Sequence, residues 1–349
     1  MGIESPIAGP AAARMLSALR HRGPDDTGRE WVPAANGGLP PVALAHARLA
    51  ILDPTPAGHQ PMSGGPAGAR TWVTFNGEIY NFHELAGELA ARGHPAHTLT
   101  DTEVLLNAYQ VWGEAAVEKL RGMFAFALAD PAAGRVWFAR DRLGIKPLYL
   151  YRPAGGGLLF ASEVRALLAA GPNLVPRRLD RRAVESFLSQ GAVYGPEAHV
   201  EGVRALDPGE TLTTDWSGNP VGRRRYWAIP FAPAGAPTPH RAGAVSELGR
   251  VAREALRLHL IADVPLGVFL SAGVDSTSVA TLATESAPGG VRTVSVGFDR
   301  PEFDETEPAA AFARELGTDH QTVRLTAADI RTDLESVLAA TDQPTVDGF

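Results

Sequence analysis

A proline-rich stretch divides the sequence into two regions that fold by different rules. Phe231 to Pro239 reads FAPAGAPTP, with three prolines in nine residues. Because proline fixes φ, lacks an N–H and pushes the preceding residue toward extended geometry, neither a helix nor a central strand can continue through it. The stretch predicts a domain over residues 1–230, a linker over 231–240 and a second domain over 241–349.

Short strand-like runs dominate the region before the linker. Runs rich in β-branched and aromatic residues, each bounded by turn signals, lie at 71–75, 124–128, 136–138 and 148–151. Helices are expected at 11–19, 82–92 and 102–112, with Asp101 as the N-cap of the third. Runs of strands with few intervening helices indicate an α+β domain of stacked sheets.

Strands and helices alternate after the linker. The expected order is helix 245–261, strand 266–270, helix 277–285, strand 293–298, helix 305–316, strand 320–325 and helix 327–341. This alternation indicates an α/β domain with a parallel, doubly wound sheet. Three strands make a thin sheet for such a fold, and no terminating element follows Asp347, so we expect an incomplete domain.

Composition excludes several classes of protein. The chain of 349 residues contains no cysteine, which excludes a disulfide framework, a thiolate metal site and a cysteine nucleophile. Its formal net charge of −7 disfavours binding to nucleic acid through phosphate neutralisation. No apolar run approaches the roughly 18 residues that cross a bilayer, and the N-terminus lacks the pattern of a signal peptide. We expect a cytoplasmic protein without nucleic-acid or membrane partners.

The stretch from Leu270 to Ser276 reads LSAGVDS and follows an apolar strand. Small residues let the backbone approach an anion, and N–H groups at the start of a helix hold phosphate oxygens. Ser271 and Ser276 add hydroxyl donors, while Asp275 would repel phosphate directly and is suited to holding Mg²⁺ against it. The pattern predicts a phosphate-binding loop. The alternative is an ordinary strand-to-helix turn with a serine N-cap.

The first region contains an arginine and an aspartate that suit the carboxylate and the ammonium group of an amino acid. Arg48 offers a bidentate fork for a carboxylate, and Asp101 offers an anion for an ammonium group. Asn76 carries a side-chain amide, and Gly77 lets a backbone N–H approach closely, so both can stabilise an oxyanion. Taken alone, Asn76-Gly77 would also suit a hairpin turn.

Six blocks in the first region occur in the order and spacing of the glutaminase domain of glutamine-hydrolysing asparagine synthetases. They are HRGPDDTG at 21–28, RLAILD at 48–53, FNGEIYN at 75–81, TDTE at 100–103, RDRLGIKPLY at 140–149 and FASEVRA at 160–166. The SAGVDS loop at 271–276 resembles the pyrophosphate loop of ATP pyrophosphatases. The resemblance covers nearly all of residues 10–349.

This resemblance implies a type-2 glutamine amidotransferase domain with the N-terminal-nucleophile fold, followed by the first part of an ATP-pyrophosphatase synthetase domain. It implies that ATP and Mg²⁺ activate aspartate as an acyl-adenylate, and that ammonia from glutamine yields asparagine, AMP and pyrophosphate. A homodimer is left open. The implied glutamine pocket contains Arg48, Leu49, Ile51, Leu52, Asn76, Gly77, Glu78 and Asp101. The implied ATP site contains Leu270, Ser271, Ala272, Gly273, Val274, Asp275, Ser276 and Val296, with Asp275 as metal ligand.

The sequence departs from the family in two places. The family's nucleophile is a cysteine directly after the initiator methionine, whereas position 2 is Gly2. The only lysines, Lys119 and Lys146, lie in the first region, and the family's second nucleotide loop has no counterpart. We therefore expect an inactive fragment, truncated at both ends, with a trimmed or misassigned start.

Three alternatives stay open. A relative in the same family would amidate a carboxylate other than aspartate. A ligase of the β-lactam-synthetase type would share the architecture without glutaminase activity, as the missing cysteine favours. A catalytically dead regulatory protein on the same fold is the third.

Overall fold

The computed structural model describes residues 8–346 except 36, 67–69, 232–234, 236–239, 288–289, 301 and 303. Most of the proline-rich stretch thus lies outside the described residues. The chain forms two compact units, Met1–Pro230 with Thr341–Phe349, and Phe231–Ala340. The sequence-based division placed the tail from residue 341 in the second domain. The structure instead groups it with the first unit, because Asp342 and Gln343 bond to that unit.

The first unit is built from antiparallel strands with helices outside them. Its strands are β1 (Asp26–Val32), β2 (Val42–Arg48), β3 (Met62–Gly64), β4 (Thr71–Ile79), β5 (Gly122–Asp130), β6 (Arg135–Arg140), β7 (Tyr149–Tyr151), β8 (Leu159–Ala161), β9 (Arg204–Ala205), β10 (Glu210–Asp215) and β11 (Pro220–Arg225). Its helices are α1 (Ala8–Ala18), α2 (Phe82–Ala90), α3 (Asp101–Trp112), α4 (Ala116–Lys119), α5 (Val164–Ala169) and α6 (Arg181–Gln190), with 3-10 turns at Pro56–Gly58 and Gly113–Ala115.

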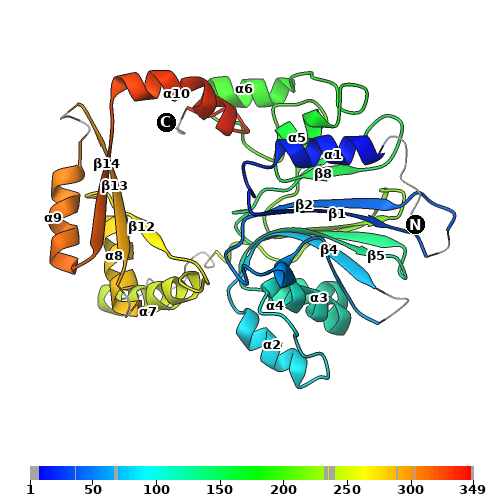
Figure 1. Ribbon diagram of the computed structural model, residues 1–349, viewed down its shortest axis with the longest axis horizontal. Helices are drawn as coiled ribbons and strands as arrows, with labels where there is room; N and C mark the ends of the chain where they lie inside the picture. The colour runs from blue at the N-terminus through cyan, green and yellow to red at the C-terminus, as the bar shows by residue number, and fades with distance from the viewer. Residues whose placement is uncertain are drawn as a thin grey trace. The chain divides into compact units, whose positions relative to one another are not determined.

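These elements stack in layers. The first layer is the sheet with the strand order β11-β10-β6-β5-β4-β3. The second layer contains the pair β1-β2 and the sheet β8-β7-β9, which lie on one face of the first layer (Figure 1). Helices α1 and α5 cover the outside of the second layer, while α2, α3 and α4 cover the outside of the first (Figure 1). The stacked antiparallel sheets expected from the sequence are thereby confirmed.

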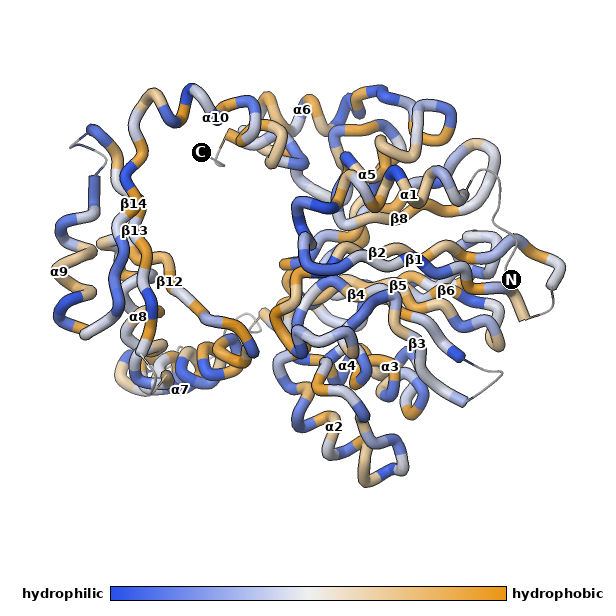
Figure 2. Tube along the Cα trace, viewed as in Figure 1, coloured by the Kyte–Doolittle hydropathy of each residue, from blue (hydrophilic) through white to orange (hydrophobic). Residues whose placement is uncertain are grey.

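The core explains why β4 and β5 read as apolar runs. Both strands are buried along most of their length, since α3 packs on one face and the β1-β2 layer on the other. Val32 and Leu44 from that layer share a cluster with Ala125, Ala127 and Phe138. Figure 2 shows apolar segments among the strands of the first unit, in keeping with a core that lies between its layers.

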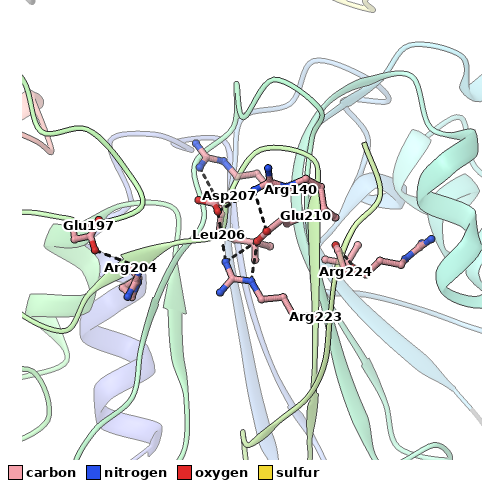
Figure 3. Close-up of polar contacts among 10 residues, drawn as sticks. Arg140, Glu197, Arg204, Leu206, Asp207, Glu210, Arg223 and Arg224 are labelled. Atoms are coloured by element: carbon pink, nitrogen blue, oxygen red, sulfur yellow. Dashed lines mark hydrogen bonds and ion pairs between the residues drawn. The ribbon is translucent and has the colours of Figure 1, made fainter. Parts of the chain in front are cut away.

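The edge strand β11, unlike the buried strands β4 and β5, is exposed and basic. Every residue from Pro220 to Arg225 is exposed, and the strand ends in three arginines. Arg223 pairs with Glu210 on the neighbouring β10, at 2.6 Å between Nη2 and Oε2 (Figure 3). Charged side chains on an exposed edge oppose pairing with another chain. The arginines of β11 therefore act as protection of this sheet edge.

The second unit alternates strands and helices as the sequence predicts. Its elements are α7 (Arg241–His259), β12 (Gly267–Phe269), α8 (Val274–Ser286), β13 (Arg292–Phe298), α9 (Thr306–Leu316), β14 (Asp319–Leu325) and α10 (Ala327–Ala340). The strands form a parallel sheet in the order β12-β13-β14, which confirms the predicted α/β class. Its buried cluster is small, comprising Leu270, Ala280, Ala309 and Ala313.

Several predicted helix starts need correction. Helix α1 begins at Ala8 instead of residue 11, and α7 begins at Arg241 instead of residue 245. Thr100, and not Asp101, is the N-cap of α3, because the Thr100 side chain accepts the N–H of Glu103. Helix α8 begins at Val274, three residues before the expected Thr277, since its N-cap is Gly273. Among the described residues, no helix is both long and apolar enough to span a membrane.

Candidate functional site

A cavity of about 1150 Å³ lies within the first unit. Among its walls are β2, the loop after it, β4 and the start of α3. All eight residues predicted for the glutamine pocket line it, namely Arg48, Leu49, Ile51, Leu52, Asn76, Gly77, Glu78 and Asp101. The fold thus brings together three blocks that are up to 53 residues apart in the sequence.

Arg48, at the end of β2, is 7% exposed and holds the loop that follows it. Its Nη1 donates to the carbonyl of Thr55 at 3.0 Å, and its Nη2 donates to the carbonyl of Leu52 at 3.0 Å. A Cβ built on Gly58 would lie 1.8 Å from Nη2 of Arg48, so a larger residue there would displace the guanidinium. In this structure Arg48 therefore orders the loop that carries Ile51 and Leu52.

Asp53 fixes the far end of the same loop. It has a positive φ of 46°, uncommon for a residue other than glycine. Its Oδ1 accepts from the Thr55 hydroxyl, and its Oδ2 accepts from the Leu99 N–H at 3.2 Å. The Thr55 hydrogen bond holds the pKa of Asp53 below its usual range. The loop after Arg48 is thus tied to the segment that precedes α3.

Asn76 and Gly77 lie inside β4 and do not form the hairpin turn that their sequence alone would also suit. They pair with Ala125 and Phe124 of β5. Gly77 has a φ of 150°, and a Cβ built on it would lie 2.1 Å from the carbonyl oxygen of Met123. Only glycine fits this position, and its backbone borders the cavity.

Asp101 lies at the first position of α3 and is 5% exposed. Its Oδ2 accepts the N–H of Ile79 at 2.9 Å, which joins α3 to the end of β4. Burial is the main reason that the pKa of Asp101 is raised to about 7; the nearby charge of Glu78 also raises it, and the hydrogen bond from Ile79 opposes the rise. A buried carboxylate beside the cavity gains most from a cationic partner.

Sequence analysis missed several polar residues that line the cavity, among them Gln60 and His46. Gln60 is buried and bonds to both the N–H and the carbonyl of Phe75, so it substitutes for a neighbouring strand along β4. His46 contacts the Thr74 hydroxyl through Nδ1 at 3.1 Å. Burial, with the positive charge of Arg48 as a second cause, lowers the pKa of His46 to about 4, so its ring is neutral at pH 7. Neither residue belongs to a local pattern that marks such a role.

The predicted phosphate loop joins β12 to α8 in the second unit. Leu270 is buried at the end of the strand, and Asp275 lies exposed in the first turn of the helix. The hydroxyls of Ser271 and Ser276 lie 2.8 Å apart, and the Ser276 hydroxyl accepts the N–H of Ser271. Val296, on β13, is 41% exposed. The two serines therefore close the loop on itself.

Glu305, which sequence analysis did not single out, reaches this loop from the start of α9. Its Oε2 accepts the N–H of Ala272 at 3.2 Å. The Ala272 N–H thus donates to a carboxylate oxygen, which is an anionic acceptor. Among the described residues, no three acidic or histidine side chains gather to form a metal site. Mg²⁺ commonly takes one or two carboxylates plus phosphate oxygens, and Asp275 fits that requirement.

Comparison with protein families divides the chain at the same place. The model of the glutamine amidotransferase domain matches residues 3–227, and the model of asparagine synthase matches residues 247–348. The two matches border the proline-rich stretch on either side.

Similar proteins carry both parts in one chain. A Mycobacterium tuberculosis protein, provisionally named a glutamine-hydrolysing asparagine synthetase, is 36% identical over 99% of this chain and 53% of its own length. Asparagine synthetase 1 of Bacillus subtilis is 32% identical over 96% of this chain and 50% of its own length. The chain spans about half the length of the curated relatives it matches.

A solved structure of glutamine phosphoribosylpyrophosphate amidotransferase from Bacillus subtilis is similar in part. It aligns with 91% of this chain and 78% of its own chain, at 16% identity and a TM-score of 0.45. At that score the likeness adds nothing to the description of the sheets given above.

Proposed function

Because the chain belongs to the glutamine amidotransferase family and continues into an asparagine synthase segment, we propose that it supplies the glutamine-binding and pyrophosphate-binding parts of an amide-forming ligase. The reaction proposed is the ATP-dependent amidation of aspartate with ammonia from glutamine, through an acyl-adenylate. The gathering of all eight predicted glutamine-pocket residues around one cavity carries this proposal.

In the proposed complex, the ammonium group of glutamine pairs with Asp101. Its side-chain amide lies against β4, where Asn76 and the backbone at Gly77 offer donors to an oxyanion. Leu49 and Leu52 line the apolar part of the pocket. Arg48 faces the carboxylate, although its bonds to Thr55 and Leu52 give it a second task in ordering the loop.

In the second unit, the residues from Leu270 to Ser276 would hold the phosphates of ATP, with Val296 beside them. Asp275 would hold Mg²⁺, which neutralises phosphate charge when bound. The start of a 13-residue helix directly after the loop supports this assignment. Glu305 accepts the Ala272 N–H, so its carboxylate would have to leave that amide before a phosphate oxygen could bind there.

Glutamine binding without hydrolysis is the first expected result. The purified chain should bind L-glutamine in a calorimetric titration, yet release no glutamate above a buffer blank, because it contains no thiol that could form an acyl-enzyme. D-glutamine is the matched control ligand. Glutamate release would contradict the assignment of chemistry, and no binding would favour the rival ligase without a glutaminase function.

Asp275→Asn tests the proposed metal role. Asparagine is nearly isosteric and can remain in the first turn of α8, but it is a poorer ligand for Mg²⁺. We expect ATP binding measured with Mg²⁺ to weaken by about tenfold or more, and binding measured with EDTA to stay unchanged. The control Asp329→Asn makes the same change in the first turn of α10. Equal Mg²⁺-dependent binding in Asp275→Asn and the parent chain would reduce Asp275 to a structural residue.

A further inference from the structure

The tail from Thr341 to Val346, called here the strap, is anchored to the first unit at three points. The Asp342 carboxylate accepts the N–H groups of Val164 and Arg165, the first two residues of α5. The Gln343 side chain accepts the N–H of His199 at 3.1 Å. The N–H of Val346 donates to the carbonyl of Gly191 at 2.7 Å. Thr341 is the one residue between the end of α10 at Ala340 and the first anchoring residue, Asp342.

Arg165 links the first anchor to Glu163, a buried acidic residue on the cavity wall. Arg165 Nε lies 3.5 Å from Asp342 and 3.0 Å from Glu163 Oε2. Glu163 is 4% exposed and also accepts from Arg22 Nε, with His21 Nε2 at 3.2 Å. A buried carboxylate is stable only while its cationic partners stay in place. Asp342 therefore helps to hold Arg165 against Glu163.

The same network continues to the glutamine pocket. His21, Arg22 and Glu163 line the cavity that contains Arg48. The segment after Arg22 packs directly on the end of β2, since a Cβ at Gly23 would lie 2.4 Å from the Arg48 backbone nitrogen. Asp25 donates its N–H to the carbonyl of Arg48 at 3.1 Å and accepts the N–H of Ala50.

We propose that the strap is a positioning element for glutamine binding. With Asp342 docked on α5, Arg165 and Glu163 fix residues 21–25, and these residues fix Arg48 and Ala50 at the pocket. Release of Asp342 loosens the 21–25 segment and weakens glutamine binding. The proposal rests on the glutamine-binding function proposed above, but its effect on residues 21–25 can be measured without any ligand.

The test compares Asp342→Ala with Asp180→Ala in the full chain. Asp180 is the matched control, because its carboxylate also accepts two backbone N–H groups at the start of a helix, at Arg182 and Ala183 of α6. Both changes remove a cap and should lower thermal stability similarly. Only Asp342→Ala should speed amide hydrogen exchange over residues 21–25, and only it should weaken glutamine binding. We expect about a two- to thirtyfold rise in Kd, the range for mutations within connected networks.

Arg165→Met provides a second variant in case Asp342→Ala does not fold. It leaves the two backbone bonds of Asp342 intact but breaks the link to Glu163, and it should change exchange and Kd in the same direction. The strap proposal would be overturned if these variants were less stable than the parent chain but showed the parent's hydrogen exchange over residues 21–25 and the parent's Kd for glutamine. If the parent chain binds no glutamine, the proposed function fails, and hydrogen exchange alone then decides the role of the strap.

Discussion

Gly77→Ala should lower the free energy of unfolding of the first unit by about 3 kcal/mol or more. The added Cβ would lie 2.1 Å from the Met123 carbonyl oxygen and 2.7 Å from the Phe124 Cα, both backbone atoms of the paired strand β5. The φ of 150° adds strain for any residue with a side chain. Relief requires β4 and β5 to separate at the cavity, so glutamine binding should be lost as well.

Urea unfolding followed by tryptophan fluorescence measures this effect in the right unit, since all six tryptophans precede the linker. Gly87→Ala is the matched control. Gly87 lies within α2, and a Cβ there meets nothing within 4 Å, so alanine should stabilise the helix by roughly 0.5 to 1 kcal/mol. Similar unfolding midpoints for the parent chain and Gly77→Ala would show that β4 and β5 are not paired as described.

Asp101→Asn should separate stability from binding. The pKa of about 7 in the folded chain lies above the ordinary aspartate value of 3.8, so the folded state holds its proton more tightly. Stability therefore falls as pH rises from about 4 to 7, by on the order of 4 kcal/mol, and then stays level. Asparagine removes this penalty while keeping an acceptor for the Ile79 N–H. The variant should unfold at higher temperature than the parent at pH 8, but not at pH 4.

Glutamine affinity should depend on pH in the opposite direction from stability, and so rise as the pH rises toward 7. Pairing with an ammonium group needs the ionised carboxylate, so affinity of the parent chain should fall by up to about tenfold for each pH unit below 7. Asp101→Asn should weaken binding by about 2 to 5 kcal/mol at pH 8 and abolish that pH dependence. Asp180→Asn, which retains an N-cap at a residue that does not line the cavity, is the control. A variant that binds as tightly as the parent at pH 8 would remove Asp101 from the pocket.

Local patterns predicted those parts of the fold in which burial leaves a clear mark on the sequence. The apolar runs of β4, β5 and β6 and the alternation of strands and helices after residue 240 are of this kind. Strands β1 and β2 escaped prediction, because each is half-buried and mixes polar with apolar residues. Helix α6 escaped for a similar reason, with Ala183 as its one buried residue.

The candidate site was predicted as a set of residues, but not as a set of contacts. The resemblance selected Arg48 and Asp101, and the fold places both on one cavity. That Arg48 also bonds to loop carbonyls, and that Asp101 accepts from Ile79 while Thr100 caps α3, depends on tertiary geometry. The docking of Asp342 on α5 joins positions 178 residues apart, and no local pattern encodes it.

The most direct test of the central claim is the hydrogen-exchange footprint of L-glutamine on the purified chain. If the first unit is a glutamine site, saturating glutamine should protect amides over residues 48–52, 76–79 and 101–103, and leave residues 241–340 unchanged. D-glutamine at the same concentration should give no such pattern. Protection confined to other segments, or none at a concentration where calorimetry shows binding, would contradict the account.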